Sequence, residues 1–151
     1  MLIDELKNIA RNNGIVGAGG AGFPAYAKMT EKADTVILNC VECEPLLKLH
    51  RQLLATHTEE IIQMLDEVRE SFGAKEAVIG IKSEYVTTIK AIEEVIGDFP
   101  NVRICALKAA YPMGDEVVLI YEATGRVIKP GGLPIDENVV VYNVETMYNL
   151  Y

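Results

Sequence analysis

The sequence of 151 residues has no tryptophan, only three phenylalanines and only three cysteines. Basic residues are also scarce, since 14 lysines and arginines face 22 acidic residues and leave a formal net charge of −8. A nucleic acid or an anionic membrane surface would require a basic patch, so neither is expected as the main partner. The apolar runs are short and interrupted, so no membrane span is expected, and the first dozen residues do not resemble a secretory leader.

The cysteines Cys40, Cys43 and Cys105 are odd in number and lack a secretory context, which indicates a reducing cytoplasm. Cys40 and Cys43 form a C-x-x-C, for which a redox pair and half of a metal site are the two active interpretations. A zinc or iron–sulfur centre needs four ligands, and neither Cys105 nor the histidines, His50 and His57, have a suitable spacing. The acidic residues on either side of Cys43 oppose thiolate formation. We therefore expect structural cysteines, no metal site, and histidines on the surface.

A glycine-rich loop lies between Gly14 and Pro24, where five glycines occupy nine positions. Glycine permits a positive φ and removes the Cβ, so such a loop suits backbone N–H groups that surround an anion or a flat cofactor. A G-x-G-x-x-G is contained in Gly17, Gly19, Gly20 and Gly22. A Rossmann loop follows a strand, but here an amphipathic helix over 2–12 comes first. A linker or tight turn is the alternative, although linkers are richer in serine and charge. We expect a ligand-binding loop that is not a Rossmann fingerprint.

Short β-branched segments alternate with helical ones along the rest of the chain. Strands, several of them apolar on both faces, are expected at 35–39, 77–81, 102–107 and 139–142. Helix starts and ends are predicted by a capping box at Thr56 and Glu59 before a stop at Gly73, a cap at Ser83 before Gly97, and a helix over 114–124 before Gly125. The alternation predicts one α/β domain of three layers over 1–151, with a mostly parallel sheet that is Rossmann-like without being the standard dinucleotide-binding fold.

Polar residues follow these strands, where ligands of open α/β sheets bind. The first strand leads into Asn39, Glu42 and Glu44, whose amide and carboxylate groups can bind ribityl or ribose hydroxyls. A solvated acidic turn is the alternative interpretation. Asp115 and Glu116 fall in the first turn of a helix, where acidic residues also interact favourably with the helix dipole.

Four segments in this order carry a resemblance to a known family: Gly-Ala-Gly-Gly-Ala-Gly-Phe-Pro at 17–24, Asn-Cys-Val-Glu-Cys-Glu-Pro at 39–45, Tyr-Pro-Met-Gly-Asp-Glu at 111–116 and Asn-Val-Glu-Thr at 143–146. Over nearly its whole length the sequence resembles the flavin-binding domain of the NADH-oxidising subunit of respiratory complex I. It is more similar to two related branches, the C subunit of the Rnf electron-transport complex and the cobalamin reductase of propanediol-utilising microcompartments.

The resemblance implies FMN and NADH as cofactors. Residues matched to the flavin site are Gly17, Gly19, Gly20, Gly22, Lys28, Asn39, Glu42, Asn143 and Thr146. Residues matched to the NADH side are Phe23, Glu44, Asp115, Glu116 and Lys129. Other roles compete for three of them, since Lys28 can be a surface lysine, Phe23 a core residue and Asn143 a helix N-cap. Three positions depart from complex I: Val41 and Glu31 replace an acidic and an aromatic residue, and Asp115 replaces a glutamate.

The implied activity is hydride transfer from NADH to flavin, followed by electron transfer to an iron–sulfur domain or subunit outside this chain. The cofactor performs this chemistry, so no residue is expected to be catalytic. The family's later cysteine clusters are absent, which leads us to expect a fragment or truncated homologue of a longer iron–sulfur flavoprotein, associated with a membrane complex or a microcompartment. The alternatives are a binding or scaffold module that keeps the fold without holding flavin, and a module that recognises a sugar or nucleotide without redox chemistry.

Overall fold

One parallel sheet organises the chain. In the computed structural model, which describes residues 1–18 and 22–151, four parallel strands lie in the order β3-β2-β1-β4. They are β1 (Thr35–Cys40), β2 (Glu76–Lys82), β3 (Val102–Leu107) and β4 (Val139–Asn143). All four expected strands are therefore confirmed, with ends that differ by one residue at most.

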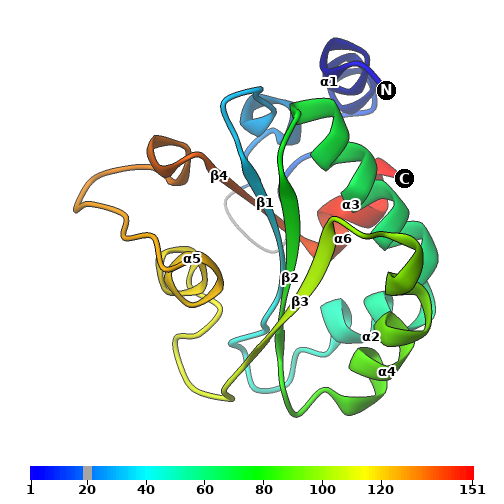
Figure 1. Cartoon of the computed structure of the whole chain (residues 1–151), viewed down its shortest axis with the longest axis vertical. Helices are drawn as coiled ribbons and strands as arrows, with labels where there is room; N and C mark the ends of the chain where they lie inside the picture. Colours follow the sequence, from blue (N-terminus) through cyan, green and yellow to red (C-terminus); the bar gives the residue numbers. More distant parts are fainter. Residues whose placement is uncertain (19–21) are drawn as a thin grey trace.

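Helices cover both faces of the sheet. They are α1 (Ile3–Asn12), α2 (Leu49–Thr56), α3 (Thr58–Phe72), α4 (Val86–Val95), α5 (Glu116–Thr124) and α6 (Val144–Leu150), with short 3₁₀ turns η1 (Ala25–Lys28), η2 (Ile96–Asp98) and η3 (Pro134–Glu137). In Figure 1, α2, α3, α4 and α6 lie on one side of the sheet and α5 lies on the other. The expected three-layer α/β architecture is confirmed. None of the helices in the described ranges is long and apolar enough to cross a bilayer.

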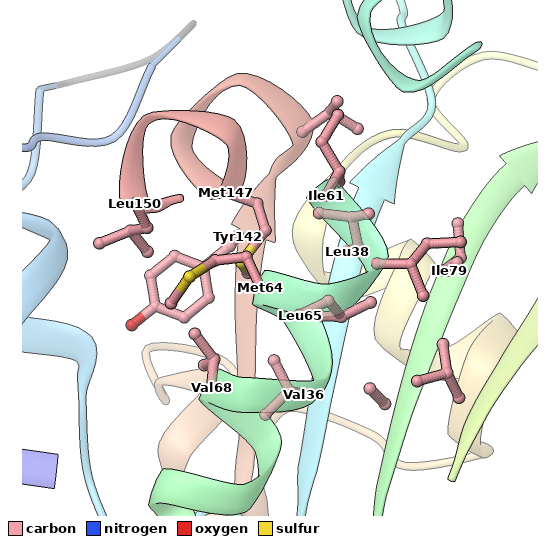
Figure 2. Packing of buried hydrophobic residues seen from close by; sticks show 14 of the residues in the cluster. Val36, Leu38, Ile61, Met64, Leu65, Val68, Ile79, Tyr142, Met147 and Leu150 are labelled. Atoms are coloured by element: carbon pink, nitrogen blue, oxygen red, sulfur yellow. The ribbon is translucent and has the colours of Figure 1, made fainter. Parts of the chain in front are cut away.

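The two sheet faces receive alternate side chains of each strand, because successive residues point to opposite sides. In β1, Val36 and Leu38 join the core cluster on the α3 side, whereas Ile37 joins the smaller cluster on the α5 side. Figure 2 shows side chains of α3, such as Leu65 and Val68, packed against this first face. Truncating Leu65, which is fully buried, to alanine would cost about 2–5 kcal/mol.

The same alternation decides where the polar strand ends point. Asn39 lies two residues after Ile37 and two before Val41, both of which pack on the α5 side. Asn143 follows Val139 and Val141, which also pack there. Asn39 is the register partner of Asn143, so the two amide side chains project together toward the α5 side at the carboxyl ends of β1 and β4.

Two of the predicted helix starts are wrong. Thr56 ends α2 instead of capping α3, and its hydroxyl donates to the carbonyl of Gln52 at 2.9 Å. The residue that precedes α3 is His57. Ser83 does not cap α4, because its N–H donates to the Leu107 carbonyl at 2.8 Å and keeps it beside β3, so α4 begins only at Val86. The predicted stops at Gly73 and Gly125 are confirmed, with φ of 69° and 74°.

The cysteines and histidines separate into different environments. Cys40 is buried, Cys43 is exposed and Cys105 is half-buried, and all three are free thiols. His50 and His57, expected on the surface, are both half-buried, and the His57 ring lies 4.5 Å from that of Tyr148. Among the described residues, no group of three or more potential metal ligands is gathered in one place.

Candidate functional site

The carboxyl ends of β1 and β4 flank the point where the strand order reverses. From β1 the chain proceeds outward through β2 and β3, and it then returns to place β4 on the other side of β1. Ligands of open α/β sheets bind at such switch points. A cleft of about 230 Å³ lies here, lined by Gly17, Phe23, Ala25, Lys28, Asn39, Gly114, Glu116, Val141, Tyr142, Asn143 and Thr146.

Asn39 is fixed at the floor of the cleft by hydrogen bonds on both ends of its amide. Its Oδ1 accepts from the Val41 N–H at 2.9 Å, and its Nδ2 donates to the Gly114 carbonyl at 3.1 Å. Gly114 can approach this closely only because it has no side chain. A Cβ there would overlap the Val41 carbonyl oxygen and lie 2.8 Å from Cys43 Sγ. Glycine at 114 thus allows the turn before α5 to close over the end of β1.

Lys28 carries a positive charge into the cleft. The η1 turn, anchored by the buried Ala25, positions the side chain so that Nζ donates to the Val141 carbonyl at 3.2 Å and lies 3.4 Å from Glu116 Oε1. The lysine is half-exposed, so its ammonium remains accessible to an anionic ligand. It is therefore part of the cleft and not an isolated surface residue.

Both arms of the glycine loop are held by the segment in which β4 passes into α6. Ala18 is bonded twice: its carbonyl accepts from Asn143 Nδ2 at 2.7 Å, and its N–H donates to Thr146 Oγ1 at 2.9 Å. On the returning arm, the Tyr142 hydroxyl donates to the Ala25 carbonyl at 3.2 Å. Gly17 joins the two arms, because its N–H donates to the Phe23 carbonyl at 2.7 Å.

A second groove adjoins the first and is more apolar. It has a volume of about 460 Å³ and shares the lining residues Phe23, Lys28, Glu116 and Val141. Its remaining lining comes from η1 and the segment after it, from η3 with the residue before it, and from β4. These residues are Ala27, Thr30, Lys32, Leu133, Pro134, Ile135, Val139 and Val140. Phe23 is 51% exposed, so its interpretation as a core residue is wrong. Its ring belongs to the boundary between the two hollows.

Glu42 is expected beside the flavin, but its carboxylate is turned into the protein. Oε1 accepts from the His50 N–H at 2.9 Å, in the first turn of α2. Oε2 is buried, has no hydrogen-bond partner in the described part of the chain, and lies 4.0 Å from Arg51 Nε. The Glu42 carbonyl also accepts from Lys82 Nζ at 2.7 Å. Glu42 thus ties the end of β1 to α2 and β2 and does not line the cleft.

The charges around His50 follow from this arrangement. Burial lowers the pKa of the His50 imidazole, and the nearby carboxylates of Glu42 and Glu145 oppose that effect. His50 is therefore a poor candidate for a permanent cation beside the cleft at neutral pH.

The structure gathers seven of the fourteen expected site residues at the first cleft: Gly17, Phe23, Lys28, Asn39, Glu116, Asn143 and Thr146. Besides Glu42, four others are placed outside it. Gly22 has a positive φ of 66°, which favours glycine. Glu44 is exposed after β1, and Lys129 is exposed beside a separate hollow lined by residues 128–133. Asp115 caps α5, where it accepts from the N–H groups of Val117 and Val118. Gly19 and Gly20 lie outside the described residues.

Four lining residues are absent from the expected set: Ala25, Gly114, Val141 and Tyr142. Gly114 carried a usable signal, since a glycine between a strand end and a helix start often marks a close backbone approach. Val141 contributes its carbonyl to Lys28, and Tyr142 its hydroxyl to Ala25. These contacts join residues more than a hundred positions apart, so no local pattern reveals them.

Comparison with known proteins gives matches over almost the whole chain. The family model described as the Nuo51 FMN-binding domain matches residues 10–151. The cobalamin reductase PduS of Salmonella typhimurium is 39% identical over 147 residues, which cover 97% of this chain and 32% of the relative. The C subunit of the Na(+)-translocating ferredoxin:NAD(+) oxidoreductase complex of Acetobacterium woodii is 37% identical over 147 residues, covering 95% of this chain and 33% of the relative.

A solved structure shows the same fold. A chain of an NAD⁺-reducing [NiFe]-hydrogenase in the air-oxidised state matches with a TM-score of 0.82 and 26% identity, covering 98% of this chain and 30% of that chain. This chain thus spans about a third of the length of the relatives that it matches. The relatives are oxidoreductases or subunits of them. The match also confirms FMN as the family's cofactor, as the sequence resemblance implied. This chain belongs to the family of the Nuo51 FMN-binding domain.

Proposed function

We propose that this chain binds FMN in the first cleft, oxidises NADH from the adjoining groove, and delivers the electrons to an iron–sulfur domain or subunit outside these 151 residues. One observation above all supports this. Four sequence segments that are distant along the chain converge on one cleft at the switch point of the sheet, through Gly17, Asn39, Glu116 and Asn143. The second groove shares lining residues with the first cleft, and this supports a neighbouring site for a second ring.

The chemistry of the cleft fits FMN, which combines a flat ring system, a chain of hydroxyls and a phosphate. Gly17 and Gly114 contribute to the lining of the cleft through their backbone, which a flat ring can contact. The amides of Asn39 and Asn143 retain hydrogen-bonding capacity beyond the bonds already made, and they suit ring heteroatoms and hydroxyls. Lys28 Nζ is the cation that would pair with phosphate or with an electron-rich edge of the ring.

The adjoining groove suits a nicotinamide nucleotide. Phe23 and the apolar residues of β4 and η3 offer surface to aromatic rings, while Glu116 and Lys32 offer groups that bind ribose hydroxyls and phosphates. When bound, FMN supplies the hydride acceptor. The work of the chain is to hold both rings in contact and to exclude water from between them. This role requires no acid, base or nucleophile from the protein.

The test is anaerobic stopped-flow absorbance of FMN-reconstituted protein mixed with NADH. We expect the visible flavin absorbance to bleach in one turnover. Without an added acceptor, turnover should then stop, because the described residues gather no ligand set for an electron-relaying metal. FMN that binds but is never bleached would favour the scaffold alternative. A chain that binds no FMN at all would refute the proposal.

Two variants separate the proposed sites. Asn39→Ala removes a cleft amide and should raise the Kd for FMN about 2- to 12-fold, the effect of losing one hydrogen bond worth about 0.5–1.5 kcal/mol. Glu44→Gln is the matched control, because Glu44 is exposed and lies outside the cleft. It should leave FMN affinity unchanged. Glu44 does not line the adjoining groove either, so the expected effect on NADH binding rests on the family match of Glu44 to the NADH side. Equal effects of both changes on FMN, measured by flavin fluorescence, would contradict this division.

A further inference from the structure

We propose that the β4–α6 junction acts as a brace that sets the shape of the glycine-loop base before any cofactor binds, with Thr146 and Asn143 as positioning residues. The brace consists of Tyr142, Asn143 and Thr146, and the loop base consists of Gly17–Ala18 and Phe23–Ala25. Asn143 and Thr146 are matched by family resemblance to flavin contacts. Their observed bonds within this chain go instead to the backbone of the loop base.

The Ala18 residue is held at both of its polar backbone groups. Asn143 Nδ2 donates to its carbonyl at 2.7 Å, and Thr146 Oγ1 accepts from its N–H at 2.9 Å. Thr146 is 1% exposed, so its hydroxyl lies where an unpaired donor or acceptor is costly. Two bonds from residues three positions apart, one at the end of β4 and the other in the first turn of α6, fix the Ala18 backbone in both position and orientation.

Asn143 gives up a common local role to make its bond. It occupies the N-cap position of α6, where asparagine side chains usually accept from the N–H groups of the first turn. Here it makes no side-chain capping bond. The amide is committed to the Ala18 carbonyl, which is what a positioning role requires and a purely helix-capping role does not.

The third member of the brace holds the other arm of the loop base. The Tyr142 hydroxyl donates to the Ala25 carbonyl at 3.2 Å in a buried position. Burial raises the pKa of Tyr142, so the hydroxyl keeps its proton and remains a donor. Since Gly17 and Phe23 are bonded to one another, fixing Ala18 and Ala25 fixes the whole loop base.

The consequence for the cofactor rests on the proposed function. A loop base that is already in place does not have to be ordered when FMN binds, and avoiding that entropic cost strengthens FMN binding. Thr146 would then influence FMN chiefly through Ala18.

The first experiment needs no cofactor. Amide hydrogen exchange at Ala18, followed by NMR in the FMN-free chain, reads the brace directly. We expect a protected Ala18 amide in the natural protein, exchange about 2- to 10-fold faster in Thr146→Val, which has no acceptor, and restored protection in Thr146→Ser, which keeps the hydroxyl. An unprotected Ala18 in the natural chain, or equal protection in the valine variant, would overturn the proposal.

A second variant separates the brace from helix capping. Asn143→Asp keeps an oxygen that can cap α6 but removes the donor that reaches the Ala18 carbonyl. We expect α6 amides to remain protected while Ala18 exchange accelerates. Loss of protection along α6 together with unchanged Ala18 exchange would show that Asn143 serves the helix and not the loop.

FMN binding then shows whether Thr146 acts through Ala18 or contacts the cofactor directly. We expect Thr146→Val to accelerate FMN dissociation by about 2- to 10-fold and Thr146→Ser to reverse this. Weaker FMN binding with normal Ala18 protection would mean that Thr146 acts on the cofactor directly, which overturns the brace. If the natural chain binds no FMN, the proposed function fails, whereas the exchange data on the FMN-free chain still decide the inference.

Discussion

Three glycines give a graded test of the backbone approach that closes the cleft. A Cβ at Gly97 would meet nothing within 4 Å. At Gly80 it would lie 2.5 Å from Leu119 Cδ1, the far end of a side chain of α5. At Gly114 it would overlap the Val41 carbonyl oxygen and lie 2.8 Å from Cys43 Sγ. None of the three has a positive φ, so alanine substitution tests space and not backbone strain.

The expected effects on the free energy of unfolding follow from what must move. Gly97→Ala should stabilise the protein by about 0.4–1 kcal/mol, because alanine reduces the entropy of the unfolded chain. Gly80→Ala should destabilise it by about 1 kcal/mol, since a buried leucine must change rotamer. Gly114→Ala should cost about 3 kcal/mol, because the obstacle is backbone. It should also weaken FMN binding, since the Gly114 carbonyl accepts the amide proton of Asn39.

Urea unfolding gives the three stabilities, and flavin fluorescence gives the FMN affinities. Ranked from most to least stable, the variants should be Gly97→Ala, Gly80→Ala and Gly114→Ala. FMN affinity should be clearly lowered only in Gly114→Ala. A Gly114→Ala protein with the urea midpoint of Gly97→Ala and unaltered FMN affinity would refute the argument, because the turn before α5 would then not depend on a missing side chain.

Two further predictions concern pH and thiol chemistry. Burial raises the pKa of the Asp34 carboxyl, but hydrogen bonds from Arg126 and Thr35 outweigh it and leave the pKa below its usual value. Its stabilising contribution is therefore complete above the unfolded-state pKa of about 3.9 and is lost as pH falls through the lower folded value. Asp34→Asn should lower the urea midpoint at pH 7 and flatten its dependence on pH below about 4, and an unchanged acid profile would contradict this. Iodoacetamide should label the exposed Cys43 first and spare Cys40, whose thiol pKa is raised by burial, until the protein unfolds; equal labelling rates, read by mass spectrometry, would contradict the fold around β1.

The strands could be predicted because their signal is local. Val36, Ile37 and Leu38 are consecutive apolar residues in one short segment, and only a strand covered on both faces buries all three at that length. The cap at Ser83 failed because the bond from its N–H to the Leu107 carbonyl keeps Ser83 beside β3, so α4 begins only at Val86. Capping signatures describe only neighbours in sequence, so this bond could not be foreseen.

The residues of the candidate site differ in the same way, since local sequence predicts some placements and contacts with other elements decide the rest. Asn39 could be assigned to the site because it lies at the end of the expected strand 35–39, where ligands of open α/β sheets bind, and because it matches a flavin contact of the family. Glu42 stands only three residues later, but α2 presents the His50 N–H to its carboxylate. Asp115 is also bonded within the chain, because its side chain accepts from backbone N–H groups in the first turn of α5. Backbone N–H groups at a helix start bind nearby carboxylates, and a sequence motif does not show whether a carboxylate binds these groups or a ligand.

The unequal filling of the two sheet faces has a consequence for motion. On one side, α1, α2, α3, α4 and α6 all contribute to the larger core cluster, whereas α5 is the main helix in the smaller cluster on the other side. Local opening requires least free energy where the fewest apolar contacts are lost. The wall of the cleft that carries Gly114 and Glu116 belongs to this thinner layer, and the wall that carries Thr146 belongs to the thicker one. Exchange of the cofactor with solvent is accordingly expected to proceed by fraying of the α5 layer while the α6 side keeps its form.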